Sequence, residues 1–98
     1  KDKCSDTPLI AACKSNNERI IRYLIEHKAD VNQKNTHGDT PLMVACMNEH
    51  ENIIKLLVEH GANVSTKCQY DNTPLLSVCK NGNERIIRYL VEHGADVN

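Results

Sequence analysis

The sequence predicts an all-α repeat solenoid, in which helix-turn-helix layers stack and β-turn or hairpin connectors project from the stack. One phrase, written DTPLIAAC, DTPLMVAC and NTPLLSVC, occurs three times at a spacing of 33 residues. Aromatic residues make up only 3% of the chain, which suits layers of aliphatic helices better than one round core. A fixed period of this length is typical of repeat architectures, in which each unit buries its apolar face against its neighbours.

The first helix of each module is expected to begin directly after the threonine of this phrase. The Thr7 hydroxyl can accept a hydrogen bond from the first turn, and Pro8 suits the first helical position because no N–H is needed there. A short apolar helix should therefore cover residues 8–14. Helices of this length are too short to be stable alone in water, so they must be held by stacking.

The second helix is expected over residues 18–26, after a turn at residues 15–17. Its apolar stripe at helical spacing consists of Ile20, Ile21, Leu24 and Ile25. On its polar side, the spacing of four residues predicts the ion pairs Glu18–Arg22 and Arg22–Glu26. In the third module the corresponding turn is the dipeptide Asn81-Gly82.

The second helix should end at a residue with a left-handed backbone conformation. Gly61 and Gly94 suit that conformation, but the first module has Lys28 at this position. A lysine there would carry roughly 1 kcal/mol of backbone strain.

The modules resemble ankyrin repeats. The resemblance rests on TPL followed by alanine, and on the endings YLIEHKADVN, LLVEHGANV and YLVEHGADVN at the same period. It covers essentially the whole chain and implies one domain over residues 1–98, with repeats at about residues 2–34, 35–67 and 68–98. The chain departs from the family where a histidine usually follows TPL. Ile10, Met43 and Leu76 stand there, so apolar contacts must replace the hydrogen bonds that this histidine makes between layers.

The composition excludes several classes of function. The net charge is -1, which gives no phosphate-neutralising surface, so nucleic acid is not an expected partner. No apolar run approaches the ~20 residues of a membrane helix, so no membrane association is expected. The five cysteines are odd in number and contain no CxxC pair, which indicates neither a disulfide framework nor a zinc site. Free thiols favour a reducing, intracellular location, cytoplasmic or nuclear.

No catalytic or cofactor motif is present, so the chain is not expected to be an enzyme. It lacks HExxH, a glycine-rich phosphate loop and a nucleophile elbow, and the turn around residues 48–50 should separate Cys46 from His50. Two ladders recur at the repeat period: Cys13, Cys46 and Cys79, and His27, His60 and His93. The alternative for the cysteines is a ladder that binds metal or senses oxidation, and the alternative for the histidines is a ladder that binds metal or senses pH. Small buried residues and helix-end histidines are the favoured interpretation, and no metal or cofactor is expected.

The expected function is that of a protein–protein interaction module, because a stack of short helices presents an extended concave surface. The binding positions should be those that vary between modules, and the resemblance implies the same places. They are Cys4, His37 and Tyr70 at the connector tips, with Lys14, Met47, Lys80, Ser15, Asn48 and Asn81 beside the first helices. Tyr70 is the expected anchor, because aromatic residues dominate interface energies.

An alternative is a structural or scaffold fragment, or an engineered, consensus-like array, without a specific partner. Residues 7–32 and 73–98 agree at 19 of 26 positions, which supports this alternative. Asn32 and Asn98 are candidate modification sites, because each follows a leucine, five further residues and then Asp-Val. This spacing resembles the site of an ankyrin-directed asparaginyl hydroxylase, although an asparagine that simply caps the connector turn is the favoured explanation.

The repeated aliphatic residues should form the core, and the two ends of the stack should be apolar and uncovered. The expected core consists of Leu9, Ala12, Ile21, Leu24, Leu42, Ala45, Ile54, Leu57, Leu75, Ile87 and Leu90. The expected exposed end residues are Leu9, Ile10, Ile20, Leu76, Ile86 and Val91. Two complementary ends make a contact that does not close on itself, so we expect a monomer with weak end-to-end self-stacking.

Overall fold

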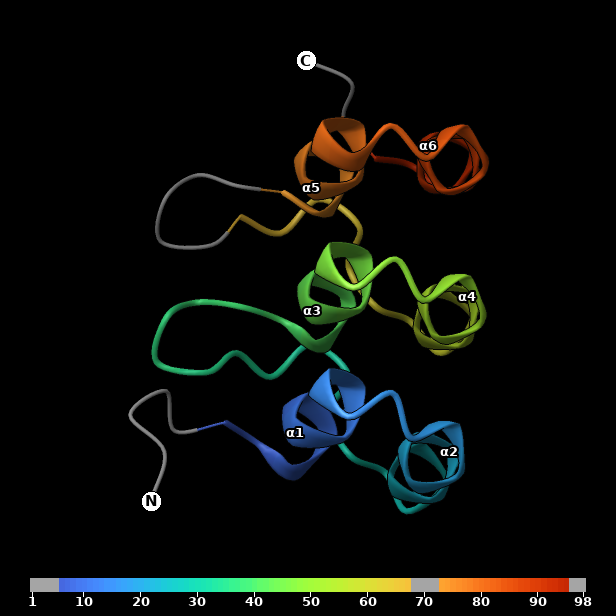
Figure 1. Ribbon diagram of the computed structural model, residues 1–98. Helices are drawn as coiled ribbons and strands as arrows, with labels where there is room; N and C mark the ends of the chain where they lie inside the picture. Colours follow the sequence, from blue (N-terminus) through green and yellow to red (C-terminus); the bar gives the residue numbers. More distant parts are fainter. Residues whose placement is uncertain (1–5, 68–72, 96–98) are drawn as a thin grey trace.

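The computed structural model describes residues 6–67 and 73–95, and these residues form six α-helices and no strand. The helices are α1 (Pro8–Lys14), α2 (Glu18–Glu26), α3 (Pro41–Met47), α4 (Glu51–Glu59), α5 (Pro74–Asn81) and α6 (Glu84–Glu92). They form three layers of two helices. In Figure 1, α1, α3 and α5 lie above one another in one column, and α2, α4 and α6 form a second column beside it. The stack measures 34 × 25 × 19 Å. Its three layers of paired helices confirm the predicted all-α solenoid.

The threonine of each phrase begins the first helix of its layer, as predicted. The Oγ atoms of Thr7, Thr40 and Thr73 accept hydrogen bonds from backbone N–H groups three residues further on, at 3.1, 3.2 and 3.1 Å. Asn17 and Asn83 cap α2 and α6 in the same way, at 3.3 Å. The repeated phrase therefore places the start of α1, α3 and α5 at the same point in every layer.

Two turns in each layer need a left-handed backbone. Lys28 has the predicted positive φ of 69°, and its counterparts Gly61 and Gly94 have 95° and 101°. A second set, which was not predicted, lies in the turn between the two helices, where Asn16, Glu49 and Gly82 have φ values of 55°, 58° and 74°. Gly82 was the available clue. Asn81, expected in this turn, is instead the last residue of α5.

The connector between α2 and α3 folds back in a β-turn and projects beyond the column of first helices (Figure 1). Asn35 organises it from a buried position. Its carbonyl accepts from the N–H of Gly38 at 3.0 Å, and its N–H donates to the carbonyl of Asp39 at 3.0 Å. Its side-chain Oδ1 accepts from the N–H groups of His37 and Asp39 at 2.9 and 3.0 Å.

The core follows the predicted aliphatic positions with two corrections. Leu24 and Ile87 are only half-buried and pack at the edge of the core. The other nine predicted core residues are buried. One polar expectation also fails: Arg22 pairs with Glu18 at 2.9 Å, and the second expected pair, with Glu26, is not formed among the described residues.

The expected exposed ends are half right. Ile20, Leu76 and Val91 are exposed, as predicted, whereas Leu9, Ile10 and Ile86 are buried. The error has a physical reason. Helical periodicity identifies which residues need to be covered, but not whether the cover comes from the same, the preceding or the following layer. None of the helices within residues 6–67 and 73–95 is long and apolar enough to cross a membrane.

Candidate functional site

The predicted binding residues beside the first helices lie in a row, because α1, α3 and α5 stack and these residues lie at or directly after the ends of the three helices (Figure 1). All six are exposed: Lys14, Ser15, Met47, Asn48, Lys80 and Asn81. Exposure is notable for Met47, which is the last residue of α3 and follows six consecutive buried positions. The row is therefore a real surface feature, with an apolar side chain between two basic ones.

Two layers of this row enclose a hollow. It has a volume of about 200 Å³ and is lined by Met47 of α3 and by Ser77, Lys80 and Asn81 of α5. Three of these four residues belong to the predicted site, and Ser77 is a further lining residue outside the predicted set. The hollow combines an apolar wall, a cation, a hydroxyl and an amide, which is suited to a side chain or backbone group of a protein.

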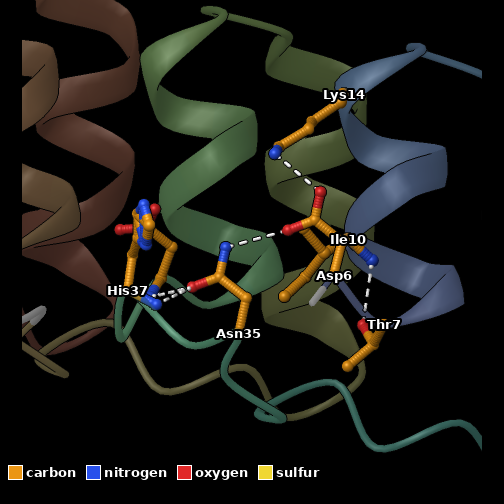
Figure 2. A network of polar contacts seen from close by, with 7 residues as sticks. Asp6, Thr7, Ile10, Lys14, Asn35 and His37 are labelled. Carbon is orange, nitrogen blue, oxygen red and sulfur yellow. Dashed lines mark hydrogen bonds and ion pairs between the residues drawn. The ribbon is translucent and has the colours of Figure 1, made fainter. Parts of the chain in front are cut away.

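The first layer joins two predicted site residues through a polar network (Figure 2). Asp6 lies at its centre, with only 5% of its side chain exposed. The Lys14 ammonium donates to Asp6 Oδ2 at 2.7 Å, and the Asn35 amide donates to Oδ1 at 2.9 Å. Asn35 in turn accepts from the N–H of His37, so the network connects α1 to the next connector.

The charges of this network set the protonation of its acid. The Lys14 ammonium and then the Asn35 amide donate hydrogen bonds to the carboxylate, and they hold the pKa of Asp6 below its ordinary value. Asp6 therefore stays ionised, and the stability that it contributes is lost only as the pH falls through the lowered pKa.

The two lysines of the row differ in their surroundings. Lys14 has its charge matched by Asp6. Lys80 occupies the equivalent position in the third repeat, where the sequence has Asn72 in place of the aspartate. An amide carries no charge, so the sequence provides Lys80 with no carboxylate from that position. The cationic character of the surface is therefore concentrated at the third repeat.

Of the five remaining predicted residues, two lie within the described part of the chain. His37 is exposed in the connector, beside the Asp6 network. Cys4, Tyr70 and Asn98 lie outside the described residues. As a hydroxylation site, Asn32 stays a prediction, and the structure gives its amide a local role.

Asn32 fastens the first repeat to the second. Its Nδ2 donates to the carbonyl of Gly61 at 3.2 Å, and its Oδ1 accepts from the N–H of Asn63 at 2.7 Å. In the second repeat Ser65 stands at this position, and its hydroxyl donates to the carbonyl of Gly94 at 3.4 Å. The connector asparagine thus bridges two layers.

The histidine ladder has a structural role at the ends of the second helices. In His27, His60 and His93, Nδ1 lies 2.9, 2.9 and 2.8 Å from the backbone carbonyl four residues earlier. A carbonyl can only accept, so each Nδ1 carries the hydrogen and satisfies a carbonyl at a helix end.

The three cysteines that recur at the repeat period differ in burial. Cys13 and Cys46 are buried, and burial raises the pKa of each thiol to about 12, whereas Cys79 is exposed. Cys46 ends up in α3 and His50 before α4, so they do not share a helix. Among residues 6–67 and 73–95, no group of three or more histidine, cysteine, aspartate or glutamate side chains could hold a metal ion.

A larger hollow lies around the turn between α3 and α4. Its volume is about 410 Å³, and Glu18, Glu49 and Glu51 are among its lining residues. Two of these carboxylates are already matched by cations. Glu18 pairs with Arg22, and Glu51 lies 3.3 Å from Lys55. The hollow therefore presents less free charge than its composition indicates.

The comparison with protein families agrees with this architecture. The family model described as Ankyrin repeats (3 copies) matches residues 1–68 and residues 28–98, so the two matches together cover the chain. The chain belongs to the ankyrin repeat family, and the predicted resemblance is confirmed. The comparison with curated proteins gives no match. Members of this family are generally protein-interaction modules without catalytic activity. The exact borders of the three repeats stay a prediction.

Proposed function

We propose that this chain is a protein–protein interaction module that binds another protein and catalyses no reaction. The hollow between α3 and α5 supports the proposal most directly, because three predicted binding residues line it together. The proposed binding surface extends from this hollow along the row to Lys14 and Ser15, and out to His37 in the connector. The connector position Tyr70 is its proposed aromatic anchor.

The chemistry of the hollow defines the partner segment. Met47 offers a flexible, polarisable side chain that can adapt to different apolar groups. Lys80 supplies a cation that matches a carboxylate, and Asn81 and Ser77 supply donors and acceptors for a backbone. The surface therefore fits a segment that presents an apolar side chain next to an acidic one. The free thiols support a reducing compartment, in the cytoplasm or nucleus, as the place of this interaction.

The test begins with partner capture and ends with a matched set of affinities. Proteins captured from an extract by the immobilised chain are identified, and each is then purified for calorimetry. Met47→Ala and Lys80→Glu should each weaken binding of the true partner by about tenfold or more, as expected for central interface residues. Glu26→Gln, at an exposed position of α2, is the control and should leave the affinity unchanged. A partner whose affinity survives both surface variants would contradict the placement of the site.

The second candidate function is a structural one, in which the chain serves as a folding unit of an array without a specific partner. The agreement between the first and third repeats favours it. The same experiment separates the two candidates. A structural unit would retain no protein whose binding depends on Met47 or Lys80.

A further inference from the structure

Met47 is exposed in the middle of the stack. Its side chain is 49% exposed, although it ends a helix whose other six residues are all buried. That helix, α3, packs against α1 on one side and α5 on the other. The exposure of Met47 is therefore a property of the interior of the array, where a repeat is present on both sides.

The other methionine of the chain provides an internal reference. The sequence contains two methionines, and both lie in α3, one helical turn apart. Met43 is only 1% exposed. The two thioethers have the same intrinsic chemistry, and their access to solvent differs. A reagent that attacks thioethers from solution should therefore distinguish Met47 from Met43.

Hydrogen peroxide is such a reagent. The sulfur attacks one peroxide oxygen, the O–O bond breaks and a sulfur–oxygen bond forms. The sulfur loses two electrons, and the second oxygen leaves with both hydrogens as water. The product, methionine sulfoxide, is polar, and methionine sulfoxide reductases return it to the thioether. In that reversal two thiols are oxidised to a disulfide, and the sulfoxide oxygen leaves as water.

This oxidation would change the chemistry of the hollow between α3 and α5. Met47 is its apolar wall, and Ser77, Lys80 and Asn81 supply its hydrogen-bond donors. A sulfoxide oxygen accepts hydrogen bonds, so the Lys80 ammonium or the Asn81 amide can bind it within the same hollow. Oxidation therefore replaces the apolar wall with an acceptor and occupies donors that a partner would need.

The fold should tolerate an oxygen on Met47 and not on Met43. Met47 lies at the surface, so an added polar atom there remains in contact with water and with the donors of the hollow. On Met43 the same atom would be buried among apolar side chains, which is unfavourable without a hydrogen bond. The position of the sulfur thus decides whether oxidation modifies the surface or disrupts the core.

We propose that Met47 is a reversible oxidation site, and that hydroperoxides close the hollow to an apolar partner side chain by converting this thioether to the sulfoxide. The effect on binding rests on the function proposed above. The selectivity of the oxidation and its effect on the hollow do not depend on a partner.

The first measurement uses hydrogen peroxide and the purified chain. After treatment, a thiol reductant restores reversibly oxidised cysteines, and fragment-ion mass spectrometry follows each methionine. Met47 should be oxidised at least about tenfold faster than Met43, because susceptibility follows exposure. The melting temperature should be retained, and methionine sulfoxide reductases should restore the thioether. Equal rates for the two methionines, or unfolding on oxidation of Met47, would overturn the proposal.

The second measurement follows the hollow by NMR. The side-chain signals of Lys80 and Asn81 should shift on oxidation and return on reduction. Met47→Leu has a similar volume and no sulfur, so peroxide should leave its signals in place, whereas Met43→Leu should respond as wild type does. An oxidised wild type whose Lys80 and Asn81 signals do not move would overturn the effect on the hollow.

The third measurement uses the captured protein whose affinity Met47→Ala and Lys80→Glu lower. Oxidation of the chain should weaken this binding by about tenfold or more, and reductase treatment should restore it. Whatever affinity Met47→Leu retains, peroxide should not change it. Unchanged binding by the oxidised chain would overturn the switch and leave the binding site intact. If no captured protein depends on Met47 and Lys80, the proposed function fails, while the first two measurements still decide the oxidation site.

Discussion

At the residue scale, Lys28 is one of three non-glycine residues of the described chain that have a left-handed backbone. Its φ of 69° is a conformation in which a side chain clashes with the neighbouring carbonyl. The equivalent positions hold Gly61 and Gly94, and a Cβ built on either glycine meets nothing within 4 Å. The free-energy cost of a side chain at this position therefore comes from the backbone conformation and not from contacts of the side chain.

Lys28→Gly should raise the free energy of unfolding by about 1 kcal/mol, because it removes this strain. Denaturant unfolding of the variant and wild type measures the gain. Gly94→Lys is the mirror control and should lose a similar amount at the equivalent position of the third repeat. An unchanged midpoint for Lys28→Gly would show that the strain is relieved in another way.

At the scale of the helices, one position of α1, α3 and α5 provides an internal comparison. Cys13, Cys46 and Cys79 are equivalent, yet the first two are buried and have pKa values raised to about 12. The unfolded chain exposes all three. A thiol whose pKa is raised by folding contributes stability that is present below its ordinary value, near 9.0, and is lost as the pH rises toward 12.

The chain should therefore lose stability between about pH 9 and pH 12, and the double variant Cys13→Ala and Cys46→Ala should lose less over this interval. Unfolding in denaturant at several pH values measures how the free energy of unfolding changes with pH.

In the native state, peptide-level mass spectrometry should find Cys79 alkylated well before Cys13 and Cys46. Equal slopes for the variant and wild type, or equal alkylation rates, would contradict the assigned burial.

The helices also show how far sequence reasoning reaches. The bounds of α1 and α2 were predictable because Thr7 and Asn17 have side chains that are typical of helix N-caps. The positive φ of Lys28 was predictable from the glycines at the same period. The left-handed turn at Glu49 was not, since glutamate gives no local signal for that conformation.

The candidate site was also predictable only in part. The repeat period indicated Met47 and Lys80, because variable positions between fixed ones lie on the surface. It could not reveal that Asp6 neutralises Lys14, because only the folded chain brings these two side chains together. Nor could it assign Ile10 and Ile86 to faces that a neighbouring repeat covers.

For the whole molecule, the stack order ranks the cost of core deletions. Leu57 is fully buried in the middle layer, which has a repeat on both sides, whereas Leu24 and Leu90 lie in the outer layers. Leu57→Ala should cost about 2–5 kcal/mol, and more than Leu24→Ala or Leu90→Ala. Denaturant midpoints of the three variants test the order. Equal losses, or a larger loss in an outer layer, would contradict it.

The unequal fastening of the two junctions has a mechanical consequence. Asn32 ties the first two repeats with two hydrogen bonds, while Ser65 ties the second to the third with one bond of 3.4 Å. A force that pulls the ends of the stack apart loads both junctions in series, and each must carry the full tension. Among the described connector contacts, the junction at Ser65 is the weaker link. Under load the Ser65 contact should therefore break before the two contacts of Asn32.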